Sequence, residues 1–135
     1  MPIRPLNYDE GKVILVPATN SEAFTKGQML TYSSGLVTAA AGAQGNDVWV
    51  ISASAITTTS SGQLIPCWPT VGILFEGDTD AVWSTVDQGT LCDLASATTL
   101  DPDASADDLF FIVKGVGTAE VDTKVIGFFS QANET

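Results

Sequence analysis

KVILVP, residues 12–17, decides the fold class of this 135-residue chain. Its four central residues are apolar and mostly β-branched, a composition that favours a strand. A run of four residues is too short for a stable helix but has the length of a buried strand. We therefore predict that the first strand lies at residues 13–16, that it is buried, and that Pro17 ends it.

Short β-rich runs of the same kind follow along the chain, with turn residues between them. The clearest pair lies at residues 28–32 and 36–39, joined by Ser33-Ser34-Gly35, where the glycine can adopt a positive φ and close a hairpin. No segment repeats apolar residues with the period of an amphipathic helix, and only residues 20–23 could form a helical turn. The pattern predicts an all-β fold, a single compact antiparallel β-barrel or sandwich of short strands with at most one or two helical turns.

The two ends of the chain lack this pattern. Residues 1–11 contain Pro2 and Pro5, which favour an extended backbone, so we predict an extended N-terminal arm that is separate from the body. The β domain is expected to span residues 12–129, followed by a flexible C-terminal tail at residues 130–135. Because the arm has no partner strand close in sequence, we expect that its removal would leave the fold intact.

Trp68 lies between Pro66 and Pro69 in another β-rich segment, residues 64–69. Each proline lacks the N–H donor that a strand ladder needs, so we expect this segment at a sheet edge or outside the sheet. Trp68 is then expected to be exposed. An exposed ring could contact a protein partner or stack on a sugar.

The charge of the chain limits its partners. It has 16 acidic and 5 basic residues and a formal charge of −11. Because phosphate groups are bound by Lys and Arg, we expect neither nucleic acid nor an anionic membrane surface as a partner. Residues 1–10 lack the apolar stretch of a signal peptide, and no run reaches the ~18 apolar residues of a membrane span. We expect a soluble protein without an export signal.

Residue types that support catalysis are scarce. The chain contains no histidine, which excludes Ser-His and Cys-His pairs and His-ligated metal sites. Glu76, Asp78 and Asp80 are expected in an exposed turn, where carboxyl groups stay ionised and cannot donate a proton at neutral pH. Cys67 and Cys92 show no metal-ligand spacing and are expected to be reduced and buried. We predict that the chain is not an enzyme and has no cofactor and no small-molecule substrate.

The acidic segment from Asp101 to Asp108 has oxygen-bearing side chains at alternating positions, as a calcium loop does. However, Ala106 replaces the glycine of the sharp turn, and Ile112 stands where a glutamate should close the ligand shell. Aspartates are also common turn formers. The segment is therefore interpreted as a solvated turn, and no metal site is predicted.

Six segments carry a resemblance to a known family: FTKGQML (24–30), GLVTAA (35–40), DAVW (80–83), GTLCDLA (89–95), DLFFIVKG (108–115) and KVIGFF (124–129). In this order they resemble the small capsid decoration, or cement, proteins of tailed bacteriophages. The resemblance implies a β-rich body on the outer surface of the virion, assembled in the host bacterial cytoplasm as a homotrimer at threefold or quasi-threefold positions. It implies the major capsid protein as the partner, and an N-terminal arm that helps to tie capsid subunits together.

The arm itself offers Ile3, Arg4, Leu6 and Tyr8 as an extended strand that could add to the sheet edge of a neighbouring subunit. Together with Trp68, these are the predicted capsid or subunit contacts. The predicted function is that of a structural virion protein that stabilises a capsid by bridging major capsid subunits. Two alternatives stay open: a carbohydrate-binding or adhesin-like β module on a virion or cell surface and, well behind it, a hydrolase that uses carboxylates.

Overall fold

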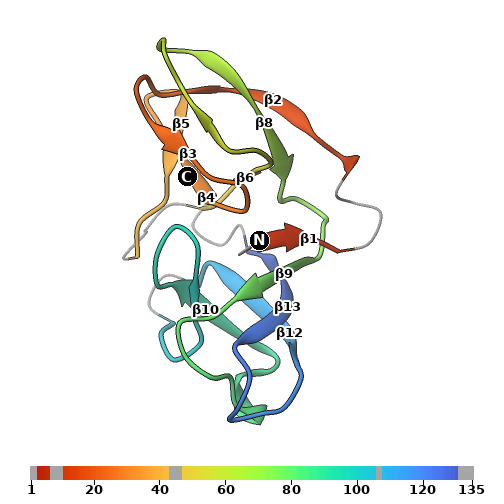
Figure 1. The fold of residues 1–135 in the computed structure, drawn as a ribbon. Coiled ribbons are helices and arrows are strands. Elements are labelled where there is room, and N and C mark those ends of the chain that lie inside the picture. Colours follow the sequence, from red (N-terminus) through yellow and green to blue (C-terminus); the bar gives the residue numbers. More distant parts are fainter. Residues whose placement is uncertain (1–2, 7–10, 43–46, 106–107, 131–135) are drawn as a thin grey trace.

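The computed structural model describes residues 3–6, 11–42, 47–105 and 108–130 (Figure 1). It confirms the all-β fold. The described residues form strands β1 to β13 and one complete 3-10 turn, η2 (Thr85–Asp87), with no α-helix among them. The strands build a closed five-stranded barrel and a curled six-stranded antiparallel sheet. Within this part of the chain, no helix is long and apolar enough to cross a membrane.

The barrel occupies the upper part of Figure 1 and has the strand order β2-β5-β4-β6-β8. Its β4–β5 hairpin confirms the predicted one, because Ser33 pairs with Leu36 and both residues between them, Ser34 and Gly35, have positive φ (51° and 82°). Two such residues are typical of the type I′ turn that matches the twist of the strands. The barrel strands are β2 (Ile14–Ala18), β4 (Met29–Ser33), β5 (Leu36–Ala39), β6 (Val50–Ser52) and β8 (Gln63–Pro69), and β3 (Ala23–Phe24) pairs separately with β7 (Ile56–Thr57).

The six-stranded sheet occupies the lower part of Figure 1 and has the order β1-β9-β13-β12-β10-β11. All of its pairings are antiparallel. Its strands are β1 (Ile3–Pro5), β9 (Phe75–Asp78), β10 (Thr90–Leu94), β11 (Leu100–Asp101), β12 (Phe110–Val116) and β13 (Lys124–Phe129).

Two apolar clusters form the core. Phe129 packs edge-to-face on both Phe75 and Phe110, with ring centroids 5.3 and 5.0 Å apart. These rings belong to the larger cluster, which also contains barrel residues, so it ties the barrel to the sheet. The barrel residues in the larger cluster include Met29, Ile51 and Trp68, and the smaller cluster fills the barrel with residues that include Val16, Leu30, Val37 and Ile65.

The prediction of an N-terminal arm separate from the body is wrong for residues 3–6. Residues 3–5 form β1, and Leu6 follows directly after it. β1 is an edge strand that pairs with β9 and places Ile3 opposite Gly77. Ile3 is fully buried in the larger core cluster, and the N–H of Leu6 continues the pairing by donating to the carbonyl of Leu74 (3.0 Å). The extended backbone was predicted, but the partner strand lies far along the chain, where no local pattern reveals it.

The predicted edge position of residues 64–69 is also wrong. They belong to β8, which lies within the barrel between β2 and β6. Trp68, expected to be exposed, is only 3% exposed, because its ring packs in the larger core cluster.

The barrel accommodates the two prolines because the neighbours of β8 overlap only at Cys67. β2 pairs with residues 63–67, and β6 pairs with residues 67–69. The carbonyl of Pro66 accepts a hydrogen bond from the N–H of Ala53, which follows β6, so the missing N–H of Pro66 points away from β2. The missing N–H of Pro66 therefore points to the side on which no strand is paired with it, and no ladder hydrogen bond to β2 is lost.

Asn20 and Ser21 form a tight turn, and β3 begins at Ala23, so the helical turn predicted at residues 20–23 is absent. The carboxylate of Glu22 explains this, because it accepts hydrogen bonds from the Thr19 hydroxyl (2.7 Å), the Thr38 hydroxyl (2.7 Å) and the N–H of Ala39 (2.8 Å). Two of these donors belong to β5. These hydrogen bonds hold the turn against the barrel wall. A helical turn stabilised only by local contacts would not make them.

We expect Glu22→Gln to lower the free energy of unfolding at pH 7 by about 1 kcal/mol, a value reduced for solvent screening. Burial raises the pKa of Glu22, but the hydrogen bonds from Thr19, Thr38 and Ala39 together outweigh this effect. The net pKa therefore lies below the ordinary value of 4.5. A lowered pKa stabilises the folded chain above the unfolded pKa, and this contribution is lost as the pH falls through the folded pKa.

Urea denaturation at pH 7 and pH 3 measures the effect. The difference between Glu22→Gln and the wild type should shrink at pH 3. Glu120→Gln serves as the control, because Glu120 is exposed, and it should match the wild type at both pH values. A difference for Glu22→Gln that stays constant between the two pH values would contradict the role of the carboxylate.

Candidate functional site

The five predicted contact residues do not lie together. Ile3 and Trp68 are buried and contribute to the core. Tyr8 lies outside the described residues. Arg4 and Leu6 lie on the six-stranded sheet and are partly exposed. Of the predicted contacts that the structure describes, these two remain available to a partner.

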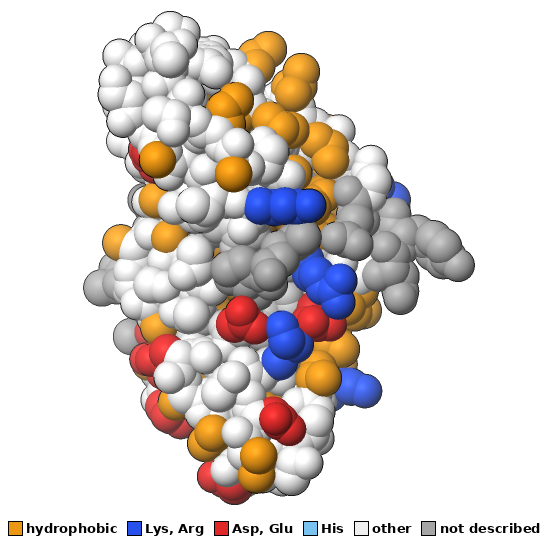
Figure 2. Space-filling model, viewed as in Figure 1, with side chains coloured by type: hydrophobic (Ala, Val, Ile, Leu, Met, Phe, Trp, Pro, Cys, Tyr) orange, Lys and Arg blue, Asp and Glu red, His pale blue; other side chains and the backbone are white. Residues whose placement is uncertain are grey.

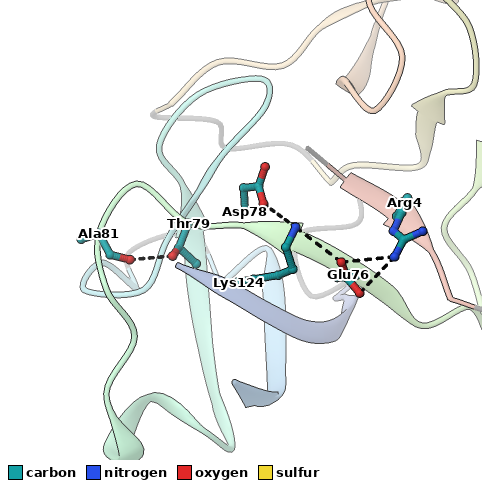
Figure 3. A network of polar contacts seen from close by, with 6 residues as sticks. All are labelled: Arg4, Glu76, Asp78, Thr79, Ala81 and Lys124. Atoms are coloured by element: carbon teal, nitrogen blue, oxygen red, sulfur yellow. Dashed lines mark hydrogen bonds and ion pairs between the residues drawn. The ribbon is translucent and has the colours of Figure 1, made fainter. Parts of the chain in front are cut away.

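Arg4 belongs to a network of charged side chains on the outer face of the sheet (Figure 3). Its guanidinium lies 3.4 Å from Glu76 Oε1, which is also 3.4 Å from Lys124 Nζ, and Lys124 Nζ lies 2.8 Å from Asp78 Oδ1. The hydrogen bond to Asp78 raises the pKa of Lys124 although burial opposes it, and Glu76 raises it further. The network joins β1, β9 and β13. Because each acid faces a cation, the arrangement does not offer a free acid–base pair of carboxyls.

A row of apolar side chains crosses the same outer face beside this network. Phe111 and Phe128 pair across β12 and β13, and their rings stack with centroids 5.1 Å apart. Leu74 lies opposite Phe128 when the β9–β13 register is continued, and Leu6 is hydrogen-bonded to Leu74. Phe128 is 41% exposed and Leu74 43%. We call Leu6, Leu74, Phe128 and Phe111 the aromatic row.

A cavity of about 420 Å³ opens beside the aromatic row. Leu74 and Phe128 contribute to its wall, which is largely apolar. A cavity of this kind can receive an apolar side chain of a partner, as the anchor pockets of protein interfaces do. The lining residues are Gly72, Ile73, Leu74, Phe128, Phe129 and Ser130.

A second apolar surface lies on the barrel, where the sequence predicted burial. The predicted burial of residues 13–16 is wrong for Val13, Ile14 and Leu15, and β2 continues through Pro17. Leu15 is 63% exposed, and Leu64 on the neighbouring β8 is 55% exposed. Nothing covers the outer side of β2 and β8 in the described chain, so these side chains face solvent. We call Leu15, Leu64 and Pro66, with Val13 just before β2, the β2–β8 patch.

The outer edge of β2 beside this patch has no paired strand among the described residues before Ala18, which pairs with Val37 of β5. Leu15 lies opposite Pro66, whose backbone points away from β2. In an antiparallel ladder such a pair exchanges no hydrogen bonds, so the N–H and C=O of Leu15 also point outward. The edge of β2 is therefore open to an added strand at Leu15.

The acidic segment has the features of a turn. The side chain of Asp101 accepts a hydrogen bond from the N–H of Asp103 (3.0 Å), as in an Asx turn. Burial, followed by the charges of Asp101 and Asp103, raises the pKa of Asp80 nearby. The described residues contain no group of three or more Cys, Asp or Glu side chains placed to hold a metal ion. Asp107 lies outside the described residues.

The two thiols are free and buried, as predicted. Burial raises the pKa of Cys67 to about 12, and burial with the charges of nearby aspartates raises that of Cys92 to about 12. Because the thiolate is the reactive form, we expect neither cysteine to react with Ellman's reagent at pH 8 in the folded protein, and both to react after unfolding. The absorbance of the released thiol measures this. Rapid labelling of the native protein would show that one of them is accessible.

Sequence reasoning missed both surfaces, although the sequence carries a signal for one of them. Phe110-Phe111 and Phe128-Phe129 are consecutive aromatic pairs inside strands. Neighbouring residues of a strand point to opposite faces, so one ring of each pair must leave a core that covers only one face. The exposed ring of each pair contributes to the aromatic row.

Comparison with protein-family models, with curated proteins and with solved structures finds no match to this chain. Evidence on the function therefore comes from the two apolar surfaces and from the resemblance of the six segments to capsid decoration proteins.

Proposed function

We propose that this chain is a structural virion protein that binds the outer surface of a phage capsid as a trimer and bridges major capsid subunits at threefold or quasi-threefold positions. The resemblance of its segments to decoration proteins suggests the partner. The observation that carries the proposal is the aromatic row with its adjacent cavity. Such a surface suits a macromolecular partner.

The aromatic row has the composition of an interface centre. Aromatic side chains are enriched where protein interfaces are fully buried, and charged residues surround such centres. Phe111 and Phe128 supply stacked rings. On the same face of the sheet, the ion pairs of Glu76 with Arg4 and Lys124 supply a polar rim. Covering the exposed ring of Phe128 removes apolar area from water, which favours binding without a cofactor.

The carbohydrate-binding alternative depends on an exposed Trp68. Its ring is buried, and so is that of Trp83. A sugar platform needs a flat aromatic face open to solvent, so this alternative loses Trp68 and Trp83 and retains Tyr32, which is 39% exposed.

Co-sedimentation with phage heads assembled without this protein tests the proposal. Wild type, Phe128→Ser and Leu74→Ser are each added over a concentration series, and head occupancy is measured. We expect Phe128→Ser to weaken binding by about tenfold or more, because a buried Phe side chain contributes about 1.5–3 kcal/mol and each ~1.4 kcal/mol is tenfold in affinity.

Val86→Ser is the matched control, because Val86 on η2 is 80% exposed and lies outside both apolar surfaces. It should bind as the wild type does. Identical curves for Phe128→Ser and the wild type would overturn the assignment to the aromatic row. Failure of the wild type to bind heads at any concentration would overturn the proposed function itself.

A further inference from the structure

Charge is divided unequally between the two halves of the molecule. Residues 12–70, which contain the barrel, include two acidic and two basic residues and so have no net charge. Residues 71–130, which contain most of the six-stranded sheet, include eleven acidic and two basic residues, a net charge of −9. Figure 2 shows the acidic side chains mainly over the lower half of the molecule.

The barrel half has few charged residues, and its acids and bases balance in number. Asp47 is buried, and the carboxylate of Glu22 accepts three hydrogen bonds. Lys12 and Lys26 are exposed. The β2 and β8 strands themselves contain no charged residue. Two copies of this acidic protein therefore meet the least repulsion where their barrels face each other.

The β2–β8 patch lies on this neutral half. Figure 2 shows hydrophobic side chains gathered over β2 and β8, away from the acidic end of the molecule. Leu15 and Leu64 are each more than half exposed, and Val13 is nearly half exposed. Their exposed area is on the order of 300 Å², within the range of the largest apolar patch on an ordinary monomer. A stable interface buries ~800 Å² on each partner, so the patch could form its apolar centre and more polar surface would surround it.

We infer that the β2–β8 patch is the surface through which copies of this chain bind one another. The inference rests on the proposed function, because it assigns a contact surface to the copies of the proposed trimer. Placed around a threefold axis, the patch of each copy meets those of both neighbours. The acidic sheet halves then point apart, and the aromatic row stays free for the capsid.

The oligomeric state of the purified protein without capsids tests this inference. Sedimentation equilibrium of the full chain from about 1 μM to 1 mM should show a trimer for the wild type. Leu15→Asp should weaken association by at least a hundredfold, since it places three carboxylates in one apolar contact. Val86→Asp adds the same charge at an exposed position of the sheet half and should associate as the wild type does.

Leu15 is exposed in the folded chain, so Leu15→Asp should keep the circular dichroism spectrum and melting behaviour of a folded monomer. If it does not fold, Leu64→Asp makes the same test from β8. A wild type that is monomeric at every concentration overturns the inference, and so does a Leu15→Asp variant that still associates.

The outcomes separate this inference from the proposed function. A monomeric wild type that fills phage heads overturns only the inference about the copies. If Leu15→Asp associates normally but no longer fills the heads, the occupant of the patch is the capsid protein and the inference is wrong. Phe128→Ser should leave the association of the free protein unchanged while it weakens head binding.

Discussion

Ile3→Ala is expected to lower the free energy of unfolding by about 2–5 kcal/mol, the range for removing a large buried aliphatic side chain. Ile3 is fully buried in the larger core cluster, and its side chain contacts the position of Gly77 on the neighbouring strand. Alanine leaves a cavity between the edge strand and the sheet. Urea denaturation followed by tryptophan fluorescence measures the loss, and the midpoint should fall clearly.

Arg4→Gln, one residue further along β1, provides the control. Arg4 forms an ion pair with Glu76 but is partly exposed, so its loss should cost less than about 1 kcal/mol. The contrast distinguishes burial from a general effect of changing β1. An Ile3→Ala variant as stable as the wild type would show that β1 is dispensable and would restore the interpretation of the N-terminus as a separate arm.

Gly127→Ala is expected to destabilise the protein by about 3 kcal/mol, the upper part of the usual range for overpacking. A Cβ at this position would overlap the carbonyl oxygen of Phe111 and lie 2.7 Å from Cε1 of Phe110. Backbone cannot move aside as a flexible side chain can, and the Phe110 ring is held by its edge-to-face contact with Phe129. The β12–β13 pairing must therefore separate to admit the methyl group.

Gly11→Ala is the matched control for this prediction, because a Cβ at Gly11 meets no heavy atom within 4 Å. Its free energy of unfolding should stay within about 1 kcal/mol of the wild type. Alanine restricts the unfolded chain more than glycine does, which favours the folded state. Thermal melting of both variants gives the comparison. Equal melting temperatures for Gly127→Ala and Gly11→Ala would contradict the close approach of β12 and β13.

The two proposals assign one apolar surface to each half of the molecule. Partner binding is proposed for Phe128 and Leu74 at the acidic half, and binding of a second copy is proposed for Leu15 and Leu64 at the neutral half. Variants at one surface should leave binding at the other intact, because the surfaces lie on different sheets. A set of single variants can therefore test capsid binding and self-association separately.

The sequence by itself determined the fold class and the local connections. Short β-branched runs cannot nucleate helices, and glycine at a turn closes a hairpin whatever lies elsewhere. The β4–β5 hairpin around Gly35 was predicted for this reason. Burial of Cys67 and Cys92 was also predictable, because small apolar side chains within strands favour the core.

Only the tertiary structure decided which strands pair over long distances and which face of each strand is covered. Ile3 pairs with a strand far along the chain, and Trp68 is buried because its ring faces the larger core cluster between the barrel and the sheet. Leu15 has the same local pattern as a core residue, yet no described residue covers its side of β2 and it is 63% exposed. Burial depends on what the fold places against a side chain. A local run specifies only that a strand forms, and the two candidate surfaces arise where the fold leaves an apolar face uncovered.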